Sequence, residues 1–235
     1  MPDIDQQKQS ILDKRVSPTG LTSLEIRIWW SDKLKEQSLF SARTTTKSYL
    51  DRVKELLADY QTTLGETAEG EPITQGLQRT RMQMLEKLNE LGLVERDEDG
   101  NVIQGKMTNL GSAMRLNLIV KTNTELANSM RMKMVSQDPL QQVLNPAFEF
   151  IRNGTSKNPR DWGQRWNECA SLCNWEGVAK GTPRMIALVN SPIWSFLGHK
   201  YADSIGTDMP PFCWNSNMGW ETVSREECKE LGLIE

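Results

Sequence analysis

The chain has 235 residues, which is long enough for one or two ordinary domains with hydrophobic cores. Hydrophobic residues make up 37% and charged residues 25%, a balance that excludes a largely disordered chain. The formal net charge of −3 gives no overall electrostatic reason to expect nucleic-acid binding. No apolar run is long enough for a transmembrane helix, and the polar N-terminus lacks the pattern of a signal peptide. We therefore expect a protein made in a cytoplasm, without membrane contact.

Residues 1–20 are predicted to form a flexible N-terminal arm, closed by the turn sequence Ser-Pro-Thr-Gly. The next segment, residues 21–30 (LTSLEIRIWW), fits a strand or the start of a helix equally well. From Thr46 the pattern is clearly helical, because apolar residues recur at steps of three and four. These residues are Tyr49, Leu50, Val53, Leu56, Leu57, Tyr60 and Leu64.

The polar stretch 65–72 (GETAEGEP) predicts a linker to a second helix. The second helix has one apolar face and is expected to stop at Gly92, a residue type that favours helix C-termini. Residues 95–101 (ERDEDGN) then predict a charged turn or hairpin tip. The sequence therefore predicts an N-terminal helical region at 21–105 and a separate C-terminal module at 106–235.

The longest helical pattern is expected to open at Thr108 and to end in a Met-rich segment that suits a core or a binding groove. Residues 106–134 hold five basic side chains and one acidic one, a balance of +4, whereas residues 1–105 hold 14 basic and 18 acidic ones, a balance of −4. A basic helix in a mildly acidic chain indicates either a contact surface or a solvated helix face. The predicted partner-binding residues on it are Arg115, Lys121, Arg131 and Lys133.

After Pro139 the predicted elements are short. In chain order they are a strand at 148–154, a helix that starts at Asn158–Pro159, a strand at 184–189, a helix from Pro192, a loop at 209–220 and a last helix between Ser224 and Gly232. Together with the preceding helices, this order predicts a mainly helical α+β protein. It would have a long central helix, a small sheet and ordered Trp-rich loops.

Six of the eight Trp residues lie after position 160. The interleaved run Arg160, Trp162, Arg165 and Trp166 can stack nucleic-acid bases, form a core, or form a protein interface. Core or interface is favoured, because this part of the chain has no excess positive charge. The Trp residues predicted to contact a partner are Trp162, Trp166, Trp194, Trp214 and Trp220.

Few residues point to catalysis or to a metal. The chain has one histidine, His199, without a recognisable nucleophile motif near it, and no phosphate-binding or dinucleotide-binding glycine pattern. The cysteines are Cys169, Cys173, Cys213 and Cys228, and the spacing of the second pair is too wide for a zinc knuckle. In a reducing cytoplasm they are expected to be free thiols. We therefore expect no enzyme activity, no cofactor and no metal.

Several segments, in this order, resemble the phage head morphogenesis family, the Mu F-like minor head proteins. They are SLFSARTTTKSYLDRV (38–53), MRLNLIVKTNTELANSMRMK (114–133), NPRDWGQRW (158–166), RMIALVNSPIW (184–194) and PPFCWNSNMGWETVSREECKELGLI (210–234). Many relatives end in a Pro-Pro-Asn segment followed by Cys-Arg-Cys, whereas the prolines here lead into Phe-Cys-Trp-Asn-Ser, so no metal or thiol role is carried over.

The resemblance implies a structural protein of the bacteriophage virion, a minor head protein assembled in the cytoplasm of the bacterial host. Its expected partners are the portal protein, the major capsid protein, or both, with homo-oligomers in the assembled particle as a further expectation. One alternative is a DNA-binding internal head protein that is ejected with the genome. The other is a zinc- or thiol-dependent enzyme built on the four cysteines and His199.

Overall fold

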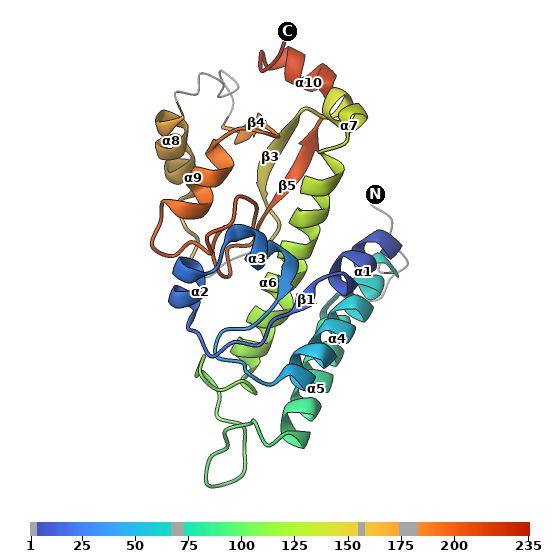
Figure 1. Cartoon of the computed structure of the whole chain (residues 1–235), viewed down its shortest axis with the longest axis vertical. Helices are drawn as coiled ribbons and strands as arrows, with labels where there is room; N and C mark the ends of the chain where they lie inside the picture. Colours follow the sequence, from blue (N-terminus) through green and yellow to red (C-terminus); the bar gives the residue numbers. More distant parts are fainter. Residues whose placement is uncertain (1–3, 67–72, 155–157, 174–182) are drawn as a thin grey trace. The chain divides into compact units, whose positions relative to one another are not determined.

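The computed structural model describes residues 4–66, 73–154, 158–173 and 183–235 (Figure 1). It confirms the mainly helical α+β fold with a small sheet. The chain forms two compact units, residues 1–127 (unit 1) and residues 128–235 (unit 2). The division falls inside the longest helix, α6 (Ala113–Val135), and not near residue 105 as the sequence suggested, because the first half of α6 contributes to the core of unit 1.

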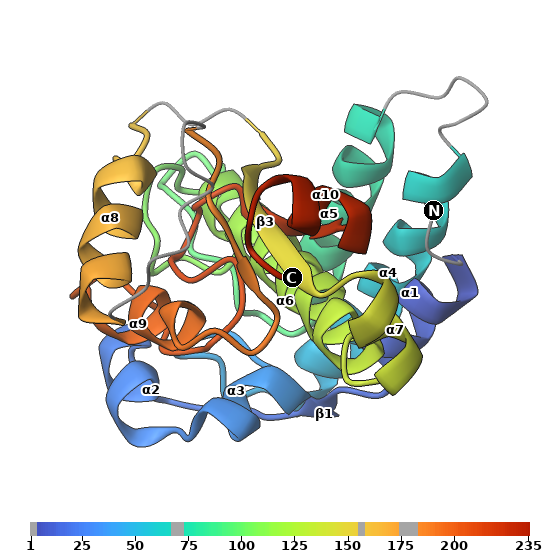
Figure 2. The same cartoon turned by 90° about the horizontal axis from the view of Figure 1, so that it is seen from above.

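Unit 1 is built on three helices, α1 (Ile4–Leu12), α4 (Lys47–Glu66) and α5 (Ile73–Glu90). Figures 1 and 2 both show α1 beside α4 and α4 beside α5. The expected flexible arm is wrong for α1, because Ile11 is fully buried against the core that α4 provides. Most of the predicted linker, residues 67–72, lies outside the described residues.

The core of unit 1 is almost wholly aliphatic. It includes Leu39, Tyr49, Leu50, Val53, Leu56, Leu57, Met84, Leu88, Leu116, Ile119 and Val120. The helical periodicity predicted the α4 and α5 members of this core correctly. Gly92 ends α5 as expected: its φ of +67° suits glycine, and the Leu93 N–H donates to the Leu88 carbonyl at 2.9 Å.

The segment 21–30 forms a helix, α2 (Ser23–Trp29), which settles the choice that the sequence left open. Thr22 and Glu25 explain the outcome, since they form a capping box. The Thr22 hydroxyl accepts from the Glu25 N–H at 3.2 Å, and the Glu25 carboxylate accepts from the Thr22 N–H at 2.7 Å. A short helix, α3 (Asp32–Gln37), follows, and β2 (Ser38–Leu39) pairs in parallel with β1 (Arg15–Val16).

The charged segment 95–101 is the tip of a hairpin, as expected, with an antiparallel bridge between Arg96 and Val102. Helix α6 begins at Ala113, five residues later than predicted from Thr108. The delay has a local cause: the Asn109 side chain binds the backbone of Glu95 and the Ile103 carbonyl, which holds this stretch in a loop.

Unit 2 contains a three-stranded antiparallel sheet in the order β4–β3–β5. Its strands are β3 (Ala147–Arg152), β4 (Ile186–Leu188) and β5 (Met218–Val223). The sequence predicted β3 and β4, but assigned the first half of β5 to a loop. That assignment is wrong for Met218 to Trp220, because these residues pair with the second half of β3.

Four helices complete the described part of unit 2. They are α7 (Pro139–Leu144), α8 (Trp162–Leu172), α9 (Ile193–His199) and α10 (Arg225–Glu230). Helix α8 begins at Trp162, after the N-cap Asp161, rather than at Asn158. The helices expected from Pro192 and after Ser224 are present, and Ser224 caps α10 as predicted. None of the helices in the described part of the chain is long and apolar enough to span a bilayer.

The core of unit 2 is an aromatic cluster gathered around β3. Its members are Phe148, Phe150, Trp162, Trp166, Trp194, Phe212 and Trp220. Phe148 and Phe150 lie two residues apart and therefore point to the same face of the strand. Phe148 stacks on Trp220 with ring centroids 4.5 Å apart, and Phe150 meets Trp162 edge-on at 5.1 Å.

A candidate side-chain-binding pocket

Most of the Trp residues predicted to contact a partner are core residues. Trp162 and Trp166 are 3% and 2% exposed and lie inside the aromatic cluster, so they cannot form a partner surface. Trp194 and Trp220 are 3% and 7% exposed, but each lines a pocket. Trp214 is partly exposed, and its carbonyl accepts from the Arg160 guanidinium at 3.1 Å.

The four basic residues predicted on α6 do not share one contact face. Arg115 is buried in unit 1, where its Nη2 donates to the Ser41 hydroxyl at 2.6 Å. Lys121 and Arg131 are partly buried, and burial lowers the pKa of Arg131. Lys133 forms an ion pair with Asp208 at 2.7 Å in unit 2. The buried Arg115 is therefore not part of a contact surface, whereas Lys121, Arg131 and Lys133 are partly exposed and their contact with a partner stays a prediction.

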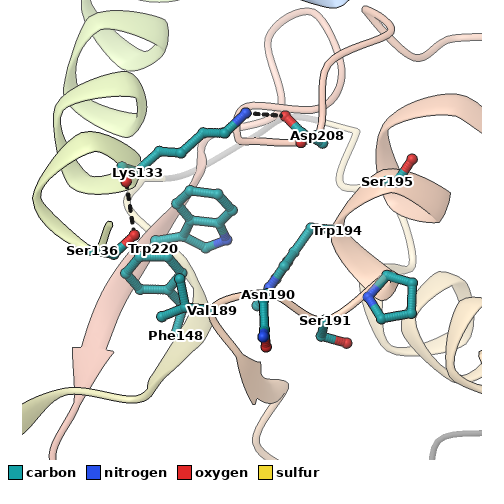
Figure 3. Close-up of a pocket in the computed structure, with 11 residues that line it drawn as sticks. Lys133, Ser136, Phe148, Val189, Asn190, Ser191, Trp194, Ser195, Asp208 and Trp220 are labelled. Atoms are coloured by element: carbon teal, nitrogen blue, oxygen red, sulfur yellow. Dashed lines mark hydrogen bonds and ion pairs between the residues drawn. The ribbon is translucent and has the colours of Figure 1, made fainter. Parts of the chain in front are cut away.

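Lys133 and the two remaining Trp residues meet at one pocket of unit 2, which has a volume of about 230 Å³ (Figure 3). The C-terminal end of α6 supplies Lys133, the loop between β4 and α9 supplies Asn190 and Ser191, and β5 supplies Trp220. Asp208 comes from the loop that follows α9. The pocket therefore brings together segments that are far apart in the chain, from Lys133 to Trp220.

Aromatic rings form the wall of this pocket. Phe148 and Trp220 stack with their planes 11° apart, and Trp194 meets Trp220 edge-on at 5.2 Å. The Trp194 indole donates to the Leu188 carbonyl at 2.9 Å, which fixes the orientation of its ring. The Trp220 indole nitrogen has no hydrogen-bond partner among the described residues, and in Figure 3 it faces the middle of the group of lining side chains. The indole nitrogens of Trp162 and Trp166 are buried and unpaired in the same way, so this feature belongs to the aromatic cluster as a whole.

The rim of the pocket is polar. The Lys133 ammonium lies 2.7 Å from the Asp208 carboxylate, and the Ser136 hydroxyl donates to the Lys133 carbonyl at 2.8 Å. Both rim charges are therefore compensated within the protein. A volume of about 230 Å³ is below the roughly 300–1,000 Å³ of typical small-molecule sites. The pocket has aromatic walls, a rim whose charges form an ion pair, and a small volume. These features suit the insertion of one side chain from a partner, as at an interface hot spot.

The cysteines behave as structural thiols. All four are free, as predicted, and burial raises the pKa of each thiol, that of Cys213 to about 11. A thiol with a raised pKa stays protonated and is a poor nucleophile at neutral pH. Within the described ranges, no group of three or more potential metal ligands is gathered. His199 lies at the end of α9, with its Nδ1 2.8 Å from the Ser195 carbonyl oxygen.

Next to the thiols, unit 2 holds a network of ion pairs. Asp203 accepts from Arg160 at 2.5 Å and from Arg165 at 3.0 Å. Hydrogen bonds from Lys200, Gln164 and Tyr201 lower the pKa of Glu168 to about 2. These pairs join α8 to the loop after α9, which indicates a structural network.

Sequence reasoning singled out Lys133, Trp194 and Trp220 separately and missed Asp208 and Asn190. No pattern distinguishes Asp208 from the other acidic residues, because its role depends on a contact with a helix 75 residues earlier. No family model, no curated protein and no solved structure matches the chain. Membership of the Mu F-like family therefore stays a prediction.

Proposed function

We propose that this chain is a bacteriophage minor head protein that acts through protein contacts, by docking on the portal or the inner capsid during head assembly. The observation that carries the proposal is spatial: segments that resemble the family, although separate in sequence, contact one another inside each unit. In unit 1, Arg115 donates to the Ser41 hydroxyl and the Ala42 carbonyl, and Asn123 donates to the Phe40 carbonyl at 3.4 Å. Both partner segments, 38–53 and 114–133, carry the resemblance.

In unit 2, the segments that carry the resemblance also contact one another. The segments 158–166, 184–194 and 210–234 each supply rings to the aromatic cluster, for example Trp166 to Trp194 at 5.5 Å and Trp194 to Trp220 at 5.2 Å. Residues that carry the resemblance therefore contribute to the core of each unit. This supports a fold shared with that family more strongly than five segments without contacts between them would.

An exposed apolar surface of unit 2 gives the proposal a docking site. Five neighbouring residues at the end of α6 and on α7 form it, and we call them the apolar ridge: Met134, Val135, Leu140, Val143 and Leu144. They are 62%, 42%, 63%, 52% and 49% exposed. Leu140, Val143 and Leu144 follow the spacing of one helix face. Contiguous exposed apolar residues of this kind mark protein–protein contact sites.

Co-expression with the portal protein of the same phage, followed by pull-down and sizing at low and high salt, tests the proposal. We expect a complex that survives high salt, because burial of apolar surface is not screened. Leu140→Glu is expected to abolish the complex. Gln142→Glu is the matched control, since it adds the same charge two residues away on the same helix at another exposed position.

Three outcomes would contradict portal docking. The first is no complex at any salt concentration, and the second is equal loss of binding in both variants. The third is binding to DNA alone with an affinity that falls steeply with salt, which would favour the DNA-binding alternative. The sizing step also reports whether the chain forms homo-oligomers.

A further inference from the structure

A second pocket, of about 190 Å³, lies wholly in unit 1. It is lined by two guanidinium groups, three hydroxyl-bearing residues and a thioether: Arg43, Arg115, Thr22, Ser23, Thr108 and Met107. Every polar side chain in this set is of a type that donates hydrogen bonds, the Thr22 hydroxyl donates to Glu25 at 2.8 Å, and no lining residue is itself a carboxylate. The pocket therefore has the donor chemistry of an oxyanion site.

Arg115 is the buried donor of this pocket. Its side chain is only 8% exposed, and its Nη2 binds the Ser41 hydroxyl and the Ala42 carbonyl. Its Nε is buried and has no hydrogen-bond partner in the described part of the chain. No described carboxylate lies within 4.0 Å of the guanidinium, so the charge is buried without a counter-ion. Such an arrangement is costly unless an anion completes it.

Arg43 adds a second positive charge. Burial lowers the pKa of Arg115, Tyr49 opposes this effect, and the nearby charge of Arg43 lowers it further. Arg43 is exposed and has a φ of +56°, a conformation held by the hydrogen bond from its N–H to the Leu21 carbonyl at 2.8 Å. The Glu25 carboxylate also interacts with Arg43, and it accepts hydrogen bonds from the Thr22 N–H and hydroxyl, so Arg43 already has a neighbouring negative charge. Of the two guanidinium groups, Arg43 is therefore the one with a neighbouring carboxylate, whereas the buried Arg115 has none within ion-pair distance among the described residues.

The surroundings indicate which anion fits. Helix α2, which begins beside Thr22 and Ser23 of the pocket, exposes Leu24, Ile28 and Trp29 at 58%, 64% and 70%. Contiguous exposed apolar residues suit a protein partner. A duplex or single strand of nucleic acid would need a track of cations along its phosphates, and this pocket has two. Its volume of about 190 Å³ suits one side chain.

We propose that the Arg43–Arg115 pocket binds the carboxylate of one Asp or Glu side chain in an acidic, otherwise apolar segment of a partner protein, with the neighbouring residues of that segment packed on α2. The inference goes beyond head docking and does not depend on it, because the pocket lies in unit 1 and the apolar ridge in unit 2. The carboxylate would accept from Arg43 and lie beside the Arg115 guanidinium, and would give the buried Arg115 a counter-ion.

The full chain labelled with ¹⁵N-arginine tests this inference, because the Arg115 Nε–H gives a signal of its own. The probes are the blocked peptide acetyl-Leu-Leu-Glu-Leu-Leu-amide, its Gln counterpart and inorganic phosphate. We expect the Glu peptide to shift the Arg115 signal and to bind about tenfold more tightly than the Gln peptide. Arg43→Gln should remove most of that preference, whereas Arg79→Gln, the same change at an exposed position on α5, should leave it intact.

Arg115→Lys keeps the buried charge but removes the Nε–H, so it should also lower the preference for Glu over Gln if the variant folds. The Arg43→Gln result stands without it, because Arg43 is exposed and its loss leaves the core unchanged. Equal binding of the Glu and Gln peptides would overturn the proposal. So would a shift of the Arg115 signal with phosphate but not with the Glu peptide, or full preference in Arg43→Gln.

Discussion

The two units of this chain have hydrophobic cores built from different types of side chain. Unit 1 packs aliphatic side chains from long helices, with Leu50, Leu57 and Leu88 fully buried. Unit 2 packs aromatic rings from short helices, strands and loops around β3. Large rings bury 150–250 Å² each, so a few of them can build a core where no long element is available.

The ion pairs of the two units also differ, in how far apart in the sequence their partners lie. Among the described residues of unit 1, most ion pairs connect residues three or four positions apart, such as Lys47–Asp51 and Arg52–Glu55. In unit 2 they connect different elements, such as Arg165–Asp203 and Arg184–Glu227. Unit 1 therefore depends on local sequence, whereas unit 2 depends on contacts between distant segments.

The largest effect is expected from opening the aromatic cluster. Trp166→Ala should lower the free energy of unfolding by about 3–5 kcal/mol, because it removes a ring that is 2% exposed and leaves a cavity. Urea unfolding followed by near-UV circular dichroism measures this loss. Leu57→Ala in unit 1 should cost about 2–5 kcal/mol but leave the aromatic signal of the folded chain unchanged. A loss of that signal in the Leu57 variant would break the distinction between the two cores.

A pH-dependent effect is expected from Glu125 in the unit 1 part of α6. Burial raises the pKa of its carboxyl group from the ordinary value of 4.5 to about 7, an effect that Lys121 opposes. Between these two pH values the folded chain binds more protons than the unfolded chain, so stability falls as the pH rises through this window. Glu125→Gln should therefore stabilise the protein by about 2–3 kcal/mol at pH 8 and by little at pH 4.

Thermal unfolding at a series of pH values measures this difference. Glu86→Gln, at an exposed position of α5, is the control and should not change the pH profile. Equal curves for Glu125→Gln and the unchanged protein would contradict a raised pKa at Glu125.

A smaller effect is expected from the ion pairs of unit 2. The Arg184 guanidinium binds Glu149 on β3 and Glu227 on α10, and these hydrogen bonds raise its pKa. Arg184→Gln should cost about 1–2 kcal/mol at low salt and less at high salt, since the pairs are partly exposed. Arg52→Gln, which removes a pair within α4, should cost less than about 0.5 kcal/mol. Equal costs in urea unfolding would remove the contrast between local and long-range ion pairs.

The smallest effect is expected at the exposed Trp residue of α2. Trp29 is 70% exposed, so Trp29→Ala should change the free energy of unfolding by no more than about 0.5 kcal/mol. Chemical denaturation of the Trp29→Ala and Trp166→Ala variants measures how much the loss of unfolding free energy differs between an exposed and a buried Trp. A large loss in the Trp29 variant would mean that α2 is packed against more of the protein than its exposure indicates.

The same contrast explains what the sequence could predict. Helices α4 and α5 follow from a regular apolar spacing, and the Gly92 stop and the α10 cap follow from local chemistry. Strand β5 could not be predicted in this way. Met218 to Trp220 come after a loop with two prolines, and they form a strand only because they pair with β3, which lies far earlier in the chain. Residues 4–12 were assigned to an arm because their burial comes from α4 and not from their own pattern.

The candidate pocket of unit 2 was only partly predictable for the same reason. Charge pointed to Lys133 and ring content pointed to Trp194 and Trp220, but nothing local relates them to each other or to Asp208. For the basic residues of α6, the sequence instead grouped side chains that the fold places apart. Composition grouped Arg115 with Lys133, whereas the fold buries the first in unit 1 and pairs the second in unit 2.

The arrangement of the indole rings gives the chain a built-in optical reporter. The Trp194 ring lies 5.5 Å from that of Trp166 and 5.2 Å from that of Trp220, close enough for the electronic transitions of each pair to couple. Such coupling splits the indole absorption into a paired positive and negative band that disappears when the rings separate. Emission from the exposed Trp29 should lie further to the red than that of the buried rings. Circular dichroism and fluorescence of the native Trp residues can therefore report on unit 2 during unfolding or partner binding, without an added label.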